Sequence, residues 1–99
     1  EGTMFLCHKD ILLLAAEGSY TRVYDIHGHV HLVCGHLHKL ERRLPPLLFF
    51  RCHRASVINL DHVVELRRQA GRTATMLNGQ EVQVSRRNWP RLLAMMKDG

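Results

Sequence analysis

The sequence predicts a mainly β fold of packed antiparallel sheets, with one short central helix and a C-terminal helix. Short apolar or alternating runs recur along the whole chain, and short polar or glycine-containing turns join them. Crossover helices, which parallel strands need, are missing between these runs. Apolar residues with helical spacing occur in only two segments. With 99 residues, the chain has room for a single domain with one modest core.

The first half of the chain predicts four strands. The run at 11–16 is short and continuously apolar, which is typical of a buried strand. The next run alternates, so that Arg22 and Val23 fall on opposite faces. Gly28 marks the turn before the return strand because glycine readily adopts a positive φ. The expected strands are 3–7, 11–16, 20–26 and 30–34.

The central segment 35–44 changes to a helical period. Leu37, Leu40 and Leu44 are spaced i, i+3, i+7, which places them on one stripe of a helix. The prolines at 45–46 should end this helix.

The second half predicts further strands and the terminal helix. Segment 47–51 leads into a strand at 56–60, and strands at 63–67, 73–77 and 80–85 follow. The pair Asn78-Gly79 predicts a type I′ hairpin turn. Ser85 is expected to cap a helix over 86–96. The apolar residues expected to hold that helix to the body are Leu92, Leu93 and Met96.

Charge and cysteine content narrow the class of protein. The net charge of +5 favours polyanionic partners, and eleven of the fourteen basic residues are arginine, whose planar fork suits phosphates and guanine edges. Three widely spaced cysteines favour buried free thiols in a reducing compartment rather than disulfides. No apolar run approaches the roughly 18 residues of a membrane span, and the N-terminus lacks the features of a signal peptide. We expect a cytoplasmic fragment of a longer protein.

Eight histidines raise the alternative of a metal-dependent sensor. His27, His29 and His31 recur with period two, but Gly28 interrupts them with a turn. Paired ligands of the C-x₂-C and H-x₃₋₅-H type are missing, so we expect surface histidines, no metal and no cofactor. Cys52 and His53 are neighbours in an extended segment and therefore point to opposite faces, which does not suit an activated thiol. No catalytic motif is present, and we expect no enzyme activity.

The motifs resemble those of LytTR-type DNA-binding domains. The stretches that carry this resemblance are the apolar run at 11–16 followed by EGSYTRVY at 17–24, then LHKLERRLPPLLFFRCHRASVIN at 37–59, LDHVVEL at 60–66 and NGQEVQVSRRNWPRL at 78–92. It covers nearly the whole chain, as one domain over residues 1–99, and implies a LytTR-like β-sandwich. Such domains bind double-stranded DNA sequence-specifically, through loops inserted into successive major grooves of direct repeats. They form the output domains of bacterial transcription regulators, bind as dimers on the DNA, and usually follow a receiver or other sensory domain.

The resemblance also implies three DNA-facing places. One is the loop and strand start with Ser19, Tyr20, Thr21 and Arg22; the second is Arg54; the third is Arg86, Arg87 and Asn88. Arg54 and Arg87 have the reach and geometry to bind guanine with two hydrogen bonds each. Arg51 is expected either to reach a phosphate or to bind a loop carbonyl, whereas His53 and Asn59 are expected to be structural.

One departure keeps a second class of function open. The family's serine after the His-Arg pair is Ala55 here, which removes one phosphate contact. The alternative is a protein-interaction module on the same scaffold that does not bind DNA.

Overall fold

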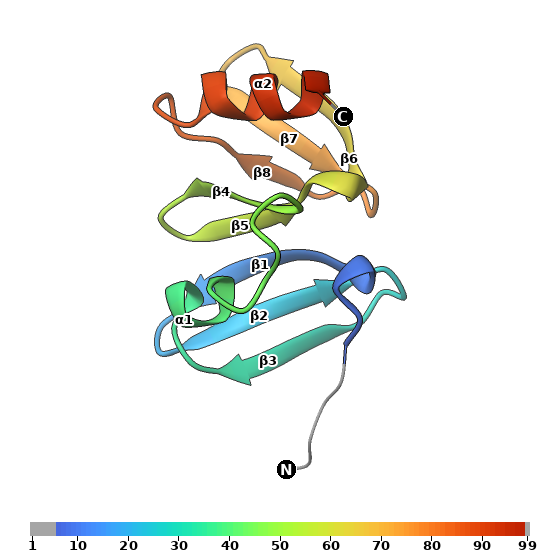
Figure 1. Cartoon of the computed structure of the whole chain (residues 1–99), viewed down its shortest axis with the longest axis vertical. Helices are drawn as coiled ribbons and strands as arrows, with labels where there is room; N and C mark the ends of the chain where they lie inside the picture. Colours follow the sequence, from blue (N-terminus) through green and yellow to red (C-terminus); the bar gives the residue numbers. More distant parts are fainter. Residues whose placement is uncertain (1–5, 99) are drawn as a thin grey trace.

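The computed structural model describes residues 6–98 and contains two antiparallel sheets (Figure 1). The first sheet is formed by β1 (Ile11–Glu17), β2 (Tyr20–Asp25), β3 (Val30–Cys34), β4 (Phe49–His53) and β5 (Ser56–Asn59), in the order β3-β2-β1-β5-β4. The second contains β6 (Val63–Arg68), β7 (Arg72–Met76) and β8 (Glu81–Gln83), in that order. The predicted class is confirmed. The strand expected at 3–7 falls mostly outside the described residues.

Two α-helices and two single-turn helices complete the part of the fold that lies within residues 6–98. They are α1 (Leu37–Glu41), α2 (Trp89–Asp98), η1 (His8–Asp10) and η2 (Leu60–His62). Asn59 begins η2 by accepting the Asp61 N–H with its side-chain oxygen, while its amide donates to the carbonyl of Ile11 at 2.9 Å. This buried amide therefore has the structural role expected from the sequence. No helix within residues 6–98 is long and apolar enough to cross a bilayer.

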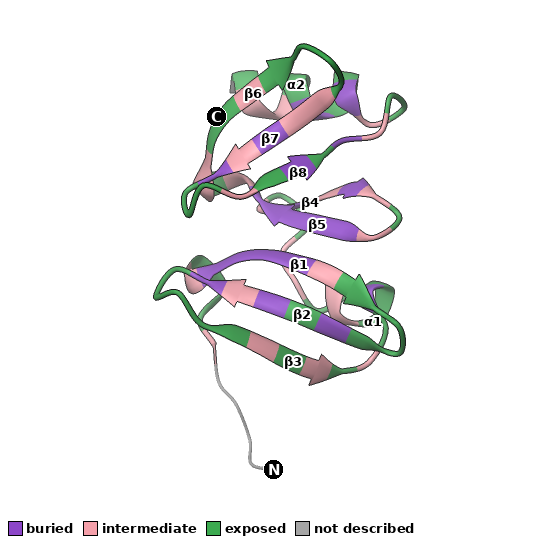
Figure 2. Ribbon diagram, turned by 180° about the vertical axis from the view of Figure 1, so that it is seen from behind, coloured by how far each residue is buried: buried purple, intermediate pink, exposed green. Residues whose placement is uncertain are grey.

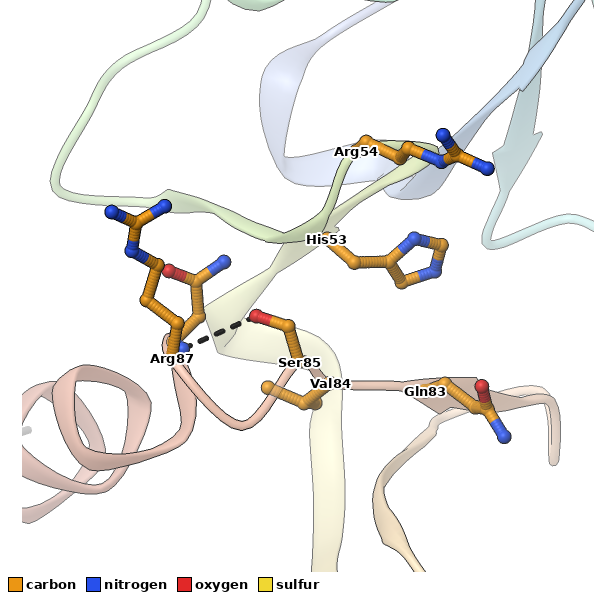
Figure 3. A pocket seen from close by; sticks show the side chains of 7 residues that line it. His53, Arg54, Gln83, Val84, Ser85 and Arg87 are labelled. Atoms are coloured by element: carbon orange, nitrogen blue, oxygen red, sulfur yellow. Dashed lines mark hydrogen bonds between the residues drawn. The ribbon is translucent and has the colours of Figure 1, made fainter.

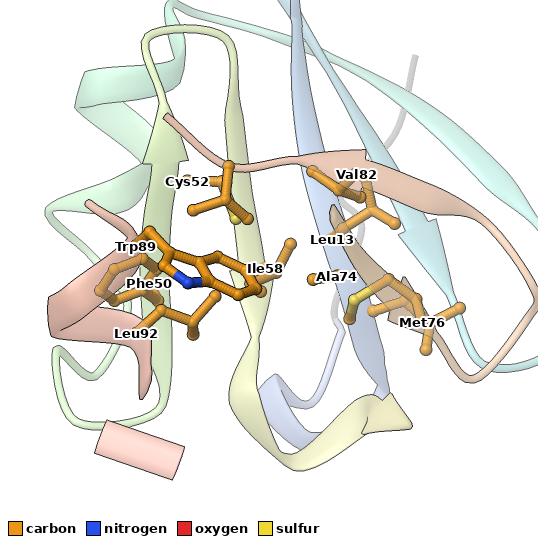
Figure 4. Packing of buried hydrophobic residues seen from close by; sticks show 11 residues of the cluster. Leu13, Phe50, Cys52, Ile58, Ala74, Met76, Val82, Trp89 and Leu92 are labelled. Carbon is orange, nitrogen blue, oxygen red and sulfur yellow. The ribbon is translucent and has the colours of Figure 1, made fainter. Parts of the chain in front are cut away.

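The hydrophobic core lies on both faces of the first sheet. On one face, Leu37 of α1 packs against Val23 and Val57. On the other, the buried residues of β1, β4 and β5 meet those of the second sheet and α2, as Figure 4 shows for Phe50, Ile58, Met76, Trp89 and Leu92. Burying a side chain of this size contributes roughly 1.5–3 kcal/mol. Strand β5 is buried along its length, whereas β3 is largely exposed (Figure 2).

Two β-bulges in the first sheet change which side chains point inward. Between Ile11 and Leu13 the pairing with β2 shifts by one residue, so that Leu12 and Leu13 both join the cluster shared with the second sheet. A second shift between Arg51 and His53 leaves Cys52 without a partner in β5. A bulge inserts an unpaired residue and leaves its polar backbone groups available to other elements.

The helices differ from the sequence prediction in their bounds. Helix α1 is shorter than 35–44 at both ends. It begins only after the extended His36, and after Glu41 the chain tightens into i→i−3 bonds, such as Arg43 N to Leu40 O at 3.0 Å. Helix α2 begins at Trp89 rather than at residue 86, and Pro90 lies in its first turn, where no N–H is needed. Leu92 is buried as expected, but Leu93 is 41% exposed, so its expected anchoring role is wrong.

Two local predictions are also wrong. The Asn78-Gly79 turn is not type I′, because Gly79 has a φ of +89° but Asn78 is not among the described residues with positive φ. Bonds from Gly79 N to Met76 O and from Met76 N to Gln80 O enclose a three-residue loop instead. The second wrong prediction concerns the cysteines, which were expected to be buried: Cys52 is buried, but Cys7 and Cys34 are exposed.

Candidate nucleic-acid interface

The hairpin that joins β4 to β5 presents Arg54 at its tip. Within this turn, Arg51 donates from Nη1 to the Arg54 carbonyl at 2.7 Å, and the Ala55 N–H donates to Nδ1 of His53 at 3.1 Å. Burial and the charges of Arg51 and Arg54 lower the pKa of His53, which keeps the accepting ring neutral. The backbone of the tip is held by these bonds, and the Arg54 side chain extends into solvent.

The guanidinium group of Arg51 is bound by other residues of the protein. Its Nε and Nη2 atoms lie 3.0 and 2.9 Å from Oε1 of Glu41 at the end of α1. Together with the bond to the Arg54 carbonyl, this occupies the guanidinium group. Of the two alternatives from the sequence, the geometry therefore favours the structural one, in which Arg51 holds the loop that carries Arg54.

The corner between β8 and α2 is bound to the bulge in β4. The unpaired carbonyl of Cys52 accepts the Ser85 N–H at 2.9 Å and the Asn88 side-chain amide at 3.2 Å. Ser85 also caps the turn, since its Oγ accepts the Asn88 N–H at 3.2 Å. Asn88, expected at the DNA, is thus half-buried and engaged with β4. Arg86 and Arg87, which lie between Ser85 and Asn88, are exposed.

An open groove of about 540 Å³ separates the hairpin tip from this corner (Figure 3). Its lining residues come from both elements: His53, Arg54, Gln83, Val84, Ser85, Arg87 and Asn88. In Figure 3, the guanidinium groups of Arg54 and Arg87 point away from each other on opposite sides of the groove. Gln83 was not among the expected site residues; its outward position in the alternation of β8 was the available signal.

The turn between β1 and β2 lies beside the same hairpin tip. The Ala16 N–H donates to the Ala55 carbonyl at 2.9 Å, just before the exposed Ser19 and Tyr20. The expected DNA contact of Thr21 is contradicted, because its side chain is fully buried and its hydroxyl donates to the Gly35 carbonyl at 2.9 Å. Arg22 is exposed and forms an ion pair with Glu17.

Backbone hydrogen bonds therefore gather the three expected places at one edge of the molecule, on the left of Figure 1. The turn between β6 and β7 adds a fourth basic segment. Its Arg72 carbonyl accepts the Val84 N–H at 2.9 Å, beside the groove, whereas its Arg67 is paired with Glu65. Within residues 6–98, no side-chain hydrogen bond or ion pair occupies the guanidinium groups of Arg54, Arg86 or Arg87. Unengaged arginines at a common edge suit phosphates and guanine edges.

A family comparison identifies this architecture. The family model described as the LytTr DNA-binding domain matches residues 1–97. The chain belongs to this family. The family is one of DNA-binding domains and is not a class of enzymes.

Two curated relatives and one solved structure resemble this LytTR domain. The CO-responsive transcriptional regulator RcoM of Rhodospirillum rubrum is 38% identical over 80 residues, covering 80% of the chain and 34% of that protein. The sensory transduction protein LytT of Enterococcus faecalis is 29% identical, covering 79% and 33%. The chain thus spans about a third of the length of these relatives. A LytTr domain of a putative methyl-accepting/DNA response regulator from Bacillus cereus has the same fold, with a TM-score of 0.79 at 22% identity over 92% of this chain and 84% of that one.

Proposed function

We propose that this LytTR domain binds double-stranded DNA sequence-specifically, as the output domain of a bacterial transcription regulator. Its edge loops insert into successive major grooves of direct-repeat sites. The observation that carries this proposal is the gathering of exposed, unengaged arginines from separate loops at one edge. A single basic helix is not needed for this mode, because the loops are held by the two sheets.

The proposed roles follow from how each side chain is engaged. Arg54 and Arg87, on the two sides of the groove, read bases, since a bidentate arginine–guanine contact gives roughly 1–3 kcal/mol of discrimination. Exposed residues beside them contact DNA phosphates: Arg86, Ser19, Tyr20 and, on release of its ion pair with Glu17, Arg22. Arg51 and Asn88 act as positioning residues for the two loops.

The partners follow from the same proposal. Two copies bind the two repeats, so that the domain dimerises on DNA. A receiver or other sensory domain precedes it in the full-length regulator, in keeping with the greater length of the curated relatives.

The test is to select a site from randomised DNA and to measure affinity for selected and random duplexes between about 50 and 200 mM salt. Each neutralised phosphate should contribute about −0.9 to the slope of log K against log salt concentration. Arg86→Ala should weaken both duplexes alike and lower the slope by roughly one contact. Arg54→Ala and Arg87→Ala should cost roughly 5- to 150-fold on the selected site and far less on random DNA.

Lys9→Ala is the matched control, because it also removes one exposed positive charge but lies in η1, at the other end of β1 from the edge loops. It should leave both affinities within about twofold. Equal losses on selected and random DNA for the Arg54 and Arg87 variants would make them phosphate contacts. If the domain shows no salt-sensitive binding even at about 50 mM salt, the DNA proposal fails in favour of a protein-interaction module.

A further inference from the structure

The turn between β2 and β3 brings a carboxylate and two imidazoles together, away from the DNA-facing edge. Oδ1 of Asp25 accepts the backbone N–H groups of His27 and His29, each at 2.9 Å. Its other oxygen, Oδ2, lies 2.8 Å from Nε2 of His31 and 3.5 Å from Nδ1 of His29. One carboxylate oxygen thus orders the turn, and the second faces two imidazole nitrogens.

We propose that Asp25, His29 and His31 bind one divalent cation of the zinc type. One ligand atom from each residue lies within 4.8 Å of the others. With metal–ligand bonds of about 2.0–2.2 Å, two ligands of a tetrahedral zinc lie about 3.3 Å apart. Without an ion, the 2.8 Å contact between Nε2 of His31 and Oδ2 is a hydrogen bond. The cation would replace that bond, with the proton of the neutral imidazole then on Nδ1. The 3.5 Å distance from His29 to Oδ2 is already close to the separation of two ligands. Rotation of the exposed His29 side chain closes the longest gap.

The donor set selects the class of ion. Two imidazole nitrogens with one carboxylate oxygen suit Zn²⁺ and its neighbours among the transition metals, whereas Mg²⁺ and Ca²⁺ prefer oxygen ligands alone. Three protein ligands leave a fourth position for water, and the His29 side chain is 70% exposed, so an ion can enter from solvent.

Asp25 is prepared for this role before any ion binds. Its side chain is almost fully buried, and the two N–H bonds to Oδ1 orient the carboxylate, as outer-shell hydrogen bonds orient metal ligands elsewhere.

This site differs from the histidine pattern that is visible in the sequence. Gly28, with a φ of +89°, turns His27 away from its neighbours, and Nε2 of His27 lies instead 4.0 Å from Asp10. Asp25 joins the cluster because β2 and β3 pair antiparallel, with its N–H donating to the His29 carbonyl at 3.0 Å. An ion held here would link the end of β2 to the start of β3 and stabilise the hairpin.

The experiment uses the chelator-treated domain without DNA, titrated with zinc chloride in a calorimeter and melted with and without the metal. We expect one ion per chain and a rise in melting temperature of at least about 5 °C at saturation. Asp25→Asn, His29→Ala and His31→Gln should each weaken binding at least about tenfold. His27→Ala and His36→Ala are the matched controls, since each removes an exposed histidine outside the cluster, and both should bind as the parent does.

The metal-free melting curves show whether a variant still folds. His29→Ala changes an exposed side chain whose backbone bond to Asp25 remains, so it serves as the test if His31→Gln is unstable. Cobalt supplies an independent readout, because its visible absorption bands on a tetrahedral site should vanish in His29→Ala and persist in His27→Ala. The proposal is overturned if binding is weak and spread over several ions, or if the control variants lose as much affinity as the cluster variants. Neither outcome bears on DNA binding.

Discussion

The side-chain amide of Asn88 donates to the carbonyl of Cys52 at 3.2 Å, and thereby links the second sheet's corner to a strand of the first. The Ser85 N–H donates to the same carbonyl at 2.9 Å. That carbonyl is available because the bulge at Cys52 interrupts the pairing of β4 with β5. Arg54 and Arg87, which we propose as base readers, are therefore positioned relative to each other through one backbone atom.

Asn88→Ala should remove one of these two bonds. We expect the free energy of unfolding to fall by about 1 kcal/mol and the affinity for the selected DNA site to fall as well, because the Arg86–Arg87 turn loses its brace. Urea unfolding and DNA titration measure the two effects. Asn88→Asp, which retains an acceptor but no donor for the Cys52 carbonyl, should behave similarly. Unchanged affinity in both variants would show that Ser85 alone holds the corner.

The stability that His53 contributes should depend on pH. Its Nδ1 accepts the Ala55 N–H, and burial, with the charges of Arg51 and Arg54, lowers its pKa below the ordinary 6.5. A histidine whose pKa is lower in the folded than in the unfolded state stabilises the protein at pH values above its unfolded pKa. That contribution is lost as the pH falls from the unfolded pKa through the folded pKa.

Urea unfolding of the parent and His53→Ala at pH values from about 8 to 5 tests this. The parent should be the more stable by about 1 kcal/mol at the alkaline end, and the difference should shrink below about pH 6.5. Comparing the two proteins cancels the contributions of the other histidines. A difference that stays constant over this range would contradict a neutral, accepting His53.

The three cysteines should separate into two reactivity classes. Burial raises the pKa of the Cys52 thiol to about 12, so its thiolate is scarce at neutral pH. Cys7 and Cys34 are exposed. Iodoacetamide should therefore modify these two in the native protein and Cys52 only in urea, as peptide mass spectrometry will measure. Equal native rates at all three positions would mean that the core around Cys52 opens readily.

Alternation along the chain predicted most of the fold. It located β3 at its observed bounds and put Val82 and Val84 inside. Thr21 has the same parity as Val23, so the alternation already indicated that it is buried; its place in the DNA-facing set came from the family resemblance and was wrong. The bulges could not be predicted, because an extra residue in one strand shows only when its partner strand is known.

The exposure of Arg54, Arg86 and Arg87 was predictable, whereas the hydrogen bonds that hold their loops were not. Arg51 meets Glu41 ten positions away, and Asn88 meets the Cys52 carbonyl thirty-six positions away; no local rule connects either pair. The predicted type of the Asn78-Gly79 turn was wrong for a related reason. The turn type depends on the number of residues in the loop, and here Leu77 is a third loop residue.

The bulge at Cys52 also bears on how this domain could be re-targeted. The acceptor that spaces the two loops is a main-chain carbonyl, and every amino acid at position 52 supplies one. The spacing between Arg54 and Arg87, which we propose as base readers, is thus independent of the bases they would contact. Exchanges at Arg54 and Arg87 could redirect base preference while the distance between the contacts stays the same, whereas deleting residue 52 would change that distance and leave both arginines in the sequence.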